Sequence, residues 1–595
     1  MPKSPDQEQD VRRPAPGKHR ALYLAALAGL SLAAGCTPTL REIDEEVAAK
    51  AGLSTRALGG LRPPSRPVSG AEGEGLQGVG TGLDPSTVNP PASALRVRPA
   101  DEHRDVEARL AAYDAASLTP TAEAPALELD LAGAFRQSQL SAPEYLTREE
   151  DYLVAAIGVL IEEHQWSPRL FNDTTFGASG AGDQGRFEHA WDVINTLRAT
   201  KKLSFGGQVE ARWVTNWTEQ LRQRATGRYV QGSELSVGVS VPLLRGSGQA
   251  ARESLIAAER GLVYEARAFE RFRREFLVQV AGEYFSLLQQ QSAIVNQERQ
   301  LASLKKFAAG TAAQVAAGRK PEFQRAIADN EVLTATSGLA NLRESFILAV
   351  DRFKVRLGVA VARPLAIKAP GFDLPEPDET LEGASAAALE YRLDLQTTRD
   401  RIEDAKRGVA NARNGLLPDL TVSGDVGVPT SRNEGVGGLG LDPEDLNWSA
   451  SATLSLPLDR RAEGLALRQQ VIRLGQAERA YGRERDNVVV ESRGALRRVD
   501  LSRFRLTLAE KAVEINRKRL EEQQLKIDQV EPQQVVDTEN ALLNAENARD
   551  DAVRDLRVSI LNYLLATDQL RVGADGGLEK LGAEGTEGPR DEGTK

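Results

Sequence analysis

The sequence predicts an α+β membrane protein, in which very long α-helices continue into strands that cross a lipid bilayer. Strand patterning is clearest in residues 420–428 and 448–456, where apolar residues alternate with small or polar ones. A period of two gives each strand one apolar and one polar face. A lone hairpin is marginal in water, and the sequence offers these apolar faces no evident soluble core. Strands of about 9–11 residues with this pattern are typical of transmembrane β-barrels.

Long helical patterns are the second observation behind this fold class. One runs from about residue 249 to 317 and another from about 461 to 528. At about 1.5 Å per residue, each is roughly 100 Å long. Gly318 and Pro321 break the first pattern, Pro532 breaks the second, and a shorter helical pattern follows each break. Each half of the chain is therefore predicted to have a long helix beside two shorter ones stacked end to end.

Internal duplication is the third observation. Helical patterns that begin at residues 143 and 393 each reach a proline 25 residues later, and a strand pair follows each of them. The predicted strand pairs are 203–213 with 235–241, and 420–428 with 448–456. Proline lacks an N–H for the sheet ladder but is tolerated where a helix begins. It stands at every predicted junction between a strand and a helix: Pro168, Pro242, Pro418 and Pro457.

The duplication divides the chain into six segments. They are a signal peptide (1–35), a lipidated N-terminus with a disordered linker (36–125), a first repeat (126–360), an inter-repeat linker (361–383), a second repeat (384–570) and a disordered tail (571–595). The first linker is rich in Pro and Gly, and the tail in Gly and Glu, which are compositions typical of disordered chain. Within the first linker, residues 40–53 are predicted to form a short helix.

The N-terminus has the pattern of an export signal. Basic residues precede an apolar run at 21–35, which is too short for the roughly 20 residues of a membrane span but suits a signal peptide. Ala33-Ala34-Gly35-Cys36 resembles a bacterial lipobox, although Ala33 stands where Leu is usual. This resemblance implies a fatty acid such as palmitate on Cys36. The alternative is an ordinary signal peptide or a structural cysteine.

Four predicted strands indicate an oligomer. Bacterial single-chain barrels start at eight strands, and open strand edges do not occur in lipid. Two copies of the chain would supply eight strands and three copies would supply twelve, so the strand count alone leaves both numbers open.

Three segments carry a family resemblance, in their order and their duplication. They are Arg392-Leu393-Asp394-Leu395, Val241-Pro242-Leu243-Leu244-Arg245-Gly246 and Ser455-Leu456-Pro457-Leu458. Over about residues 127–570 the chain resembles the TolC-type outer-membrane efflux protein family. It departs from the family at Leu393, where proline is usual, and in an extra stretch at 169–202, which makes the first strand of the first repeat hard to locate.

The resemblance implies a homotrimer with a long α-helical coiled-coil barrel plus a transmembrane β-barrel of twelve strands shared by three protomers. It implies a channel-tunnel in the Gram-negative outer membrane, with the helices in the periplasm, that exports small molecules or proteins in a tripartite efflux or type I secretion assembly. The implied partners are a periplasmic membrane-fusion adaptor protein, an inner-membrane transporter and outer-membrane lipid. No cofactor is implied.

The second helix break is the candidate periplasmic gate. The family has a D-V-L-D-like segment there, and the matching residues 534–537 keep only the second acidic position. Three copies of a carboxylate would form a ring that attracts cations. The candidate gate residues at the two breaks are Asp528, Glu531, Gln534, Asp537, Arg319 and Lys320. The alternative is that these are solvated charges at helix ends.

Composition excludes several other classes. The net charge of −10 argues against general nucleic-acid binding, and a single cysteine excludes an intramolecular disulfide framework. The four histidines lack metal-ligand spacing, and no catalytic motif stands out, so no enzyme is predicted. The alternative function is a periplasmic coiled-coil structural or adaptor lipoprotein that does not span the membrane.

Overall fold

The computed structural model describes residues 40–57, 127–183, 186–221, 228–368, 377–429, 443–525, 531–572 and 578–580. The chain divides into two units, one of residues 1–53 with 62–97 and one of residues 54–61 with 98–595. The first unit contains most of helix α2 (Leu40–Ala57), in agreement with the predicted short helix. All further elements belong to the second unit, which carries both repeats.

Each repeat has one very long helix and three shorter ones. The first repeat contains α5 (Leu131–Ser141), α6 (Pro143–Trp166), α7 (Glu253–Ala316) and α8 (Glu322–Leu357). The second contains α9 (Leu381–Tyr391), α10 (Leu393–Asn414), α11 (Arg461–Leu525) and α12 (Pro532–Ala566). The helices α7 and α11 have 64 and 65 residues, so each is about 97 Å long.

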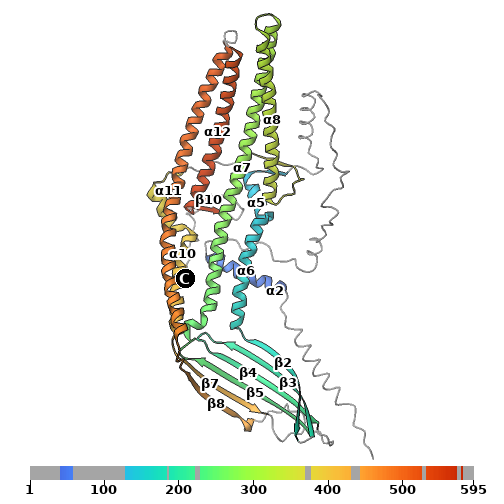
Figure 1. The fold of residues 1–595 in the computed structure, drawn as a ribbon, viewed down its shortest axis with the longest axis vertical. Helices are drawn as coiled ribbons and strands as arrows, with labels where there is room; N and C mark the ends of the chain where they lie inside the picture. Colours follow the sequence, from blue (N-terminus) through green and yellow to red (C-terminus); the bar gives the residue numbers. More distant parts are fainter. Residues whose placement is uncertain are drawn as a thin grey trace, which may run out of the picture. The chain divides into compact units, whose positions relative to one another are not determined.

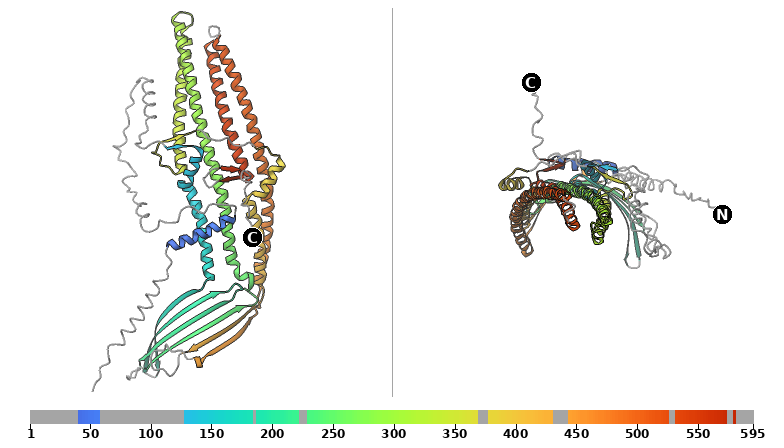
Figure 2. Two further views of the ribbon diagram at one scale, coloured as in Figure 1. Left: turned by 180° about the vertical axis from the view of Figure 1, so that it is seen from behind. Right: turned by 90° about the horizontal axis from the view of Figure 1, so that it is seen from above.

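The helices of the second unit lie side by side in one curved row, which is seen end-on in Figure 2. Away from the sheet the order across the row is α11, α12, α7, α8. Toward the sheet, α10 replaces α12 and α6 replaces α8 (Figure 1). Each long helix thus lies beside two shorter ones stacked end to end, as the helical patterns predicted. The row is four helices wide toward each end of the rod, and in the middle α9 packs against α11 and α5 packs against α6, α7 and α8.

The hydrophobic core lies midway along the rod, where the stacked helices meet. Tyr145, Phe276, Tyr284, Phe353 and Tyr563 are all at least nine-tenths buried there. Two short parallel strands, β1 (Leu127–Leu129) and β6 (Leu365–Ile367), join the starts of the two repeats beside this core. An antiparallel pair follows α12: β9 (Leu570–Val572) with β10 (Leu578–Lys580).

A buried ion pair fastens the two repeats together at this level. The Arg274 guanidinium on α7 lies 2.8 Å from a carboxylate oxygen of Asp568, and both side chains are almost completely buried. Asp568 has the left-handed φ of 56° that ends α12. Its other carboxylate oxygen accepts a hydrogen bond of 3.2 Å from the Leu393 backbone N–H, at the start of α10. One side chain therefore stabilises the end of one helix and the beginning of another.

One antiparallel sheet of six strands lies at one end of the rod (Figure 1). Its strands, in spatial order, are β2 (Arg169–Asp183), β3 (Arg186–Lys202), β4 (Gln208–Leu221), β5 (Arg228–Pro242), β7 (Asp419–Pro429) and β8 (Asn447–Ser455). Short 3₁₀ turns, η2 (Gly248–Arg252) and η3 (Pro443–Asp445), precede α7 and β8.

The prediction that the first repeat contributes two strands to this sheet is wrong, because its described residues contribute four, β2 to β5. Residues 169–202, which the sequence left as an extra stretch, form the hairpin β2–β3. Residues 203–207, predicted as the start of a strand, instead form a tight turn in which the Leu203 N–H donates to the Gly207 carbonyl. Gly206 has φ +101° in this turn, and a Cβ there would lie 2.7 Å from the Gly246 carbonyl oxygen, so only glycine fits.

Candidate functional site

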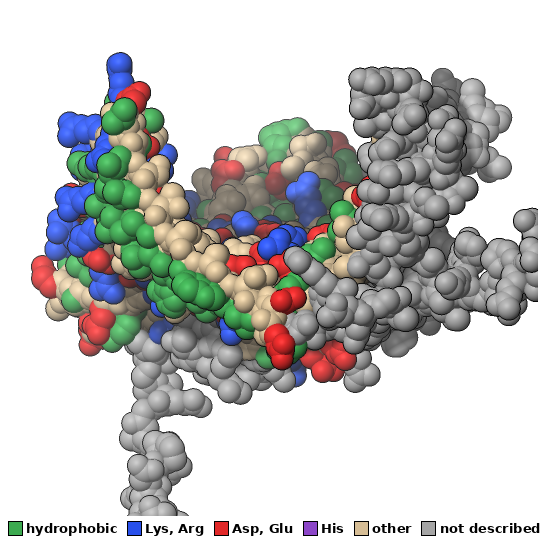
Figure 3. All heavy atoms as spheres, turned by 90° about the horizontal axis from the view of Figure 1, so that it is seen from below, with side chains coloured by type: hydrophobic (Ala, Val, Ile, Leu, Met, Phe, Trp, Pro, Cys, Tyr) green, Lys and Arg blue, Asp and Glu red, His purple; other side chains and the backbone are tan. Residues whose placement is uncertain are grey.

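The six-stranded sheet has one apolar face, formed by every second residue of each strand. The ladder registers place eleven large apolar residues on it, each between 38 and 78% exposed. They are Leu170, Phe176, Leu197, Trp213, Leu235, Val237, Val239, Val422, Val426, Trp448 and Leu454. Figure 3 shows hydrophobic side chains in a band along the strands at this end of the molecule. Soluble monomers rarely expose an apolar surface this extensive.

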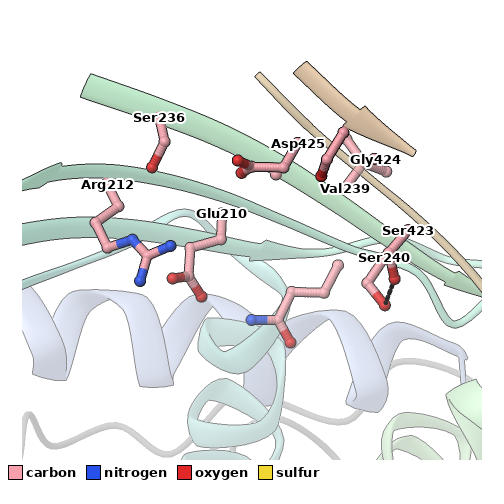
Figure 4. Close-up of a pocket in the computed structure, with 11 residues that line it drawn as sticks. Glu210, Arg212, Ser236, Val239, Ser240, Ser423, Gly424 and Asp425 are labelled. Carbon is pink, nitrogen blue, oxygen red and sulfur yellow. Dashed lines mark hydrogen bonds between the residues drawn. The ribbon is translucent and has the colours of Figure 1, made fainter. Parts of the chain in front are cut away.

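The opposite face, here called the polar face, carries hydroxyls and charges. A shallow cavity of about 350 Å³ lies on it across β4, β5, β7 and β8 (Figure 4). Glu210, Arg212 and Asp425 line this cavity, together with Ser240 and Ser423, whose hydroxyls are 3.3 Å apart. The polar face extends onto the β2–β3 hairpin, where Arg198 lies 3.6 Å from Asp173. Alternation of the two faces agrees with the parity predicted for β4, β5, β7 and β8.

The strands are tilted relative to the line on which their helix-side ends lie. Residues Arg169, Thr200, Glu210, Gly238, Asp425 and Ser449 form one row across the sheet. This row begins at the first residue of β2 but meets β8 six residues before its last residue, Ser455. Six residues of about 3.3 Å, over five strand spacings of about 4.8 Å, correspond to a tilt of about 40°. Barrel strands have tilts of about 35–45°.

Every predicted junction proline lies where a strand meets a helix. Pro168 separates α6 from β2, and Pro418 separates α10 from β7. Pro242 is the last residue of β5, and Pro457 lies just beyond β8, before α11. The polypeptide therefore passes between the sheet and the helical row four times, at α6, α7, α10 and α11.

The candidate gate residues lie at the far end of the rod from the sheet. Arg319 and Lys320 occupy the turn between α7 and α8, which Gly318 begins with φ +70°. Glu531 immediately precedes α12, and Asp537 is exposed on the first turns of that helix. Gln534 is exposed beside them, whereas Asp528 lies outside the described residues.

The described charges at the two helix breaks do not pair with each other. The Asp537 carboxylate accepts a hydrogen bond of 3.0 Å from Gln533 Nε2 on its own helix. Among the described residues, no ion pair joins Arg319 or Lys320 to Glu531 or Asp537.

Sequence reasoning missed a polar contact between the repeats, where α7 faces α12. Glu546 of α12 lies 2.9 Å from Arg299 and 3.2 Å from Arg517. Seven residues earlier, the buried Glu539 accepts a hydrogen bond from the Ser303 hydroxyl. Burial raises the pKa of Glu539, and the negative charge of Glu546 raises it further, although the Ser303 hydrogen bond opposes both effects. The heptad spacing of the two acids was a usable signal, because it places both on one helix face.

Two further observations concern membrane attachment. Cys36, the predicted lipidation site, lies outside the described residues. In the described part of the chain, no helix combines the length and the apolar character that a transmembrane helix needs.

Comparison with protein families supports the resemblance seen in the sequence. Residues 384–560 match the family described as outer membrane efflux protein. This confirms the family resemblance over most of the second repeat. No curated protein matches the chain.

Solved structures extend the likeness to the fold of both repeats. The match to the CmeC outer membrane channel of Campylobacter jejuni covers 73% of this chain and 85% of the CmeC chain, at 14% sequence identity and a TM-score of 0.56. The match to the open state of the MtrE outer membrane channel of Neisseria gonorrhoeae covers 73% of this chain and 88% of the MtrE chain, at 16% sequence identity and a TM-score of 0.55. The match to the outer membrane protein VceC of Vibrio cholerae covers 73% of this chain and 95% of the VceC chain, at 17% sequence identity and a TM-score of 0.52. The chain thus has the fold of outer-membrane efflux channels.

Proposed function

We propose that three copies of this chain form a channel-tunnel in the Gram-negative outer membrane. In this assembly the sheets form a barrel in the lipid, and the helical rows form a tunnel through the periplasm. The channel exports small molecules or proteins as part of a tripartite efflux or type I secretion assembly. A periplasmic membrane-fusion adaptor protein and an inner-membrane transporter are its partners, and transport by this channel involves no catalytic step or cofactor.

The observation that carries the proposal is the two-faced sheet. Lipid covers the apolar face at no cost, whereas the charges of Glu210, Arg212 and Asp425 on the other face need water. The tilt of about 40° and the alternation of polar and apolar residues match a membrane barrel. The family match and the fold of the neighbouring structures support the same assignment.

Threefold assembly supplies what a single chain lacks. One sheet has two edge strands, β2 and β8, and edges do not persist in lipid. The curved helical row also needs further copies to surround a lumen (Figure 2). The number three rests on the family resemblance.

The alternative is a periplasmic coiled-coil lipoprotein that is anchored at Cys36 and never crosses the membrane. It would leave the apolar face of the sheet unexplained, because eleven large apolar side chains would remain in water. An adaptor would also need compact lipoyl-like domains, and neither repeat resembles one in the described residues.

Membrane fractionation with gel analysis tests the proposal. A barrel protein stays in the outer-membrane fraction after high-salt and carbonate washes, even when Cys36 is replaced by Ala. Unheated samples should run as a compact oligomer that becomes a monomer on boiling. Release of Cys36→Ala by carbonate, with no heat-sensitive oligomer, would instead establish the lipoprotein alternative. Crosslinking in cells, followed by identification of the captured inner-membrane transporter, would then define the export pathway.

A further inference from the structure

The additional hairpin β2–β3 is built into the sheet as part of its wall. Fifteen residue pairs join β2 to β3, and fourteen join β3 to β4, so the ladder is continuous to the edge. The apolar face continues onto the hairpin through Leu170, Phe176 and Leu197. On the polar face, Arg198 and Asp173 pair with each other. The hairpin thus continues both faces of the sheet, although its apolar face also carries Asn172, Thr174 and Asn195, where the Asn195 amide donates hydrogen bonds to the other two side chains.

The six-stranded sheet matches the helical row in width. Four helices side by side, at about 9–10 Å per helix, span roughly 36–40 Å. Six strands at about 4.8 Å spacing and 40° tilt span about 38 Å along the same arc, whereas four would span only about 25 Å. With the hairpin, the sheet and the helices of each copy cover equal shares of a common circumference.

Edge strands of neighbouring copies are complementary in direction. β2 leaves the helical row at Arg169, and β8 returns to it at Ser455, so these edges are antiparallel when copies stand side by side around one axis. Arg169 and Ser455 both occupy the polar face, and Leu170 and Leu454 both occupy the apolar face. Pairing Arg169 with Ser455 keeps every side chain on its proper face and brings Asp173 opposite Ser451.

We propose that β8 of each copy pairs with β2 of the next in this register, and that three copies close a barrel of eighteen strands. The partner at each edge is a second copy of this chain. This inference rests on the proposed threefold channel and replaces its twelve-stranded barrel. The register adds no further stagger at the interface, which gives the closed barrel a tilt of about 35°, within the range of membrane barrels.

An eighteen-stranded barrel makes the membrane section as wide as the tunnel. Its backbone diameter is about 34 Å at the closed-barrel tilt of about 35°, against about 22 Å for twelve strands at the same tilt. The cross-section inside the backbone is therefore about 2.25 times larger, because area follows the square of the strand number. Barrels of 16–18 strands hold an open aqueous channel, so cargo that fits the tunnel meets no narrower ring of strands.

Cysteine crosslinking across the copies tests the pairing. Asp173→Cys combined with Ser451→Cys should give covalent dimers and trimers with a short bis-maleimide in purified outer membranes. Each single variant is a control for reaction through Cys36. Ser423→Cys with Ser451→Cys is the matched control within one chain, since these residues face each other on β7 and β8 and should crosslink without changing the oligomer.

Twelve-stranded closure predicts a different crosslink. If the hairpin left the wall, β4 would become the edge, and Glu210→Cys with Thr453→Cys would join copies instead. Covalent trimers from that pair, or a wall about 22 Å across in electron cryomicroscopy of the intact protein, would overturn the eighteen-stranded barrel and leave the channel proposal standing. Absence of any threefold membrane assembly would reject the proposed function itself. A wall about 34 Å across establishes the inference even if the crosslinks fail to form.

Discussion

Arginine at Val237 is the most direct probe of which face meets lipid. Val237 is 45% exposed on the apolar face, and it lies five residues from Pro242, where β5 joins the helical region. At about 3.3 Å per residue and 40° tilt, this places it about 13 Å into the strand region, half the height of an apolar band of about 25 Å. In the proposed channel, Val237 is therefore at the midplane of the bilayer.

The expected cost follows from that depth. An arginine on the lipid face of a barrel costs about 2–4 kcal/mol at the midplane and about 0–1 kcal/mol near the interfaces. Val237→Arg should therefore reduce assembly by about 30- to 700-fold per copy, since about 1.4 kcal/mol is a factor of ten. Val239→Arg lies two residues nearer the helices, so it should reduce assembly less than Val237→Arg does.

Ser240→Arg and Thr453→Arg are controls on the polar face of β5 and β8, and their depth is close to that of Val239. A charge there meets the water of the lumen, so the amount of assembled protein should stay close to wild type. The measurement is the heat-sensitive oligomer in washed outer membranes, relative to total chain. Equal losses from both faces, or a larger loss at Val239 than at Val237, would refute the transmembrane register.

Four further predictions concern other parts of the chain. Cys36→Ala should abolish labelling by a fatty-acid probe, and labelling that persists would reject lipidation at Cys36. Asp568→Ala leaves Arg274 buried with only Glu270 for a partner and should destabilise the fold by about 3 kcal/mol, measured by denaturant unfolding, whereas a change below 1 kcal/mol would contradict the buried pair. Because the pKa of Glu539 is raised in the folded chain, its contribution to stability is lost as pH rises from its unfolded pKa through its folded pKa. Glu539→Gln should therefore raise thermal stability at pH 7 and flatten its rise toward acid pH, and an unchanged pH profile would contradict this. Asp537→Ala should weaken cation preference and block by multivalent cations in planar bilayers without loss of the oligomer, while unchanged currents would remove Asp537 from the gate.

Patterns with a strong period were predictable from the sequence. The ends of β7 and β8 were predicted to within two residues, because apolar residues alternate regularly with small or polar ones along both strands. The long helices and their breaks were predictable for a related reason. Gly318, Pro321 and Pro532 interrupt the helical periods with residues that disfavour a continuous helix.

The β2–β3 hairpin was missed because its alternation is imperfect. Phe171 lies on the polar face, where its ring is 5.2–5.5 Å from the guanidinium groups of Arg198 and Arg169. In the sequence this aromatic residue interrupts the alternation, because it stands at a position of the polar face. In the sheet its ring is stabilised there by cation–π contacts with the two arginines. Leu203 and Phe205 caused the opposite error, a strand predicted where there is none. They continue the alternation of β4, but they lie in a turn that Gly206 permits.

Only the position of the candidate gate residues could be predicted from the sequence, not their contacts. The helix breaks fix Arg319, Lys320 and Asp537 at the end of the rod away from the sheet. Which charges meet depends on how the curved rows of different copies approach each other. Glu539 and Glu546 were overlooked because buried acids on a coiled-coil seam go against the apolar pattern that identifies such a seam.

An insertion of two strands is the smallest change that widens this sheet and keeps the rest of the chain in place. In an antiparallel sheet each added strand reverses the direction of the chain. A single extra strand between α6 and α7 would end at the edge of the sheet away from the helical row. The hairpin β2–β3 restores the direction, so β5 still returns to α7 at Pro242. It also keeps the facing parity, because the turn at 203–207 brings Lys202 opposite Gln208 on the same face. The four passages between sheet and helices, and the seam between the two repeats, can therefore stay unchanged while the wall gains half its width again.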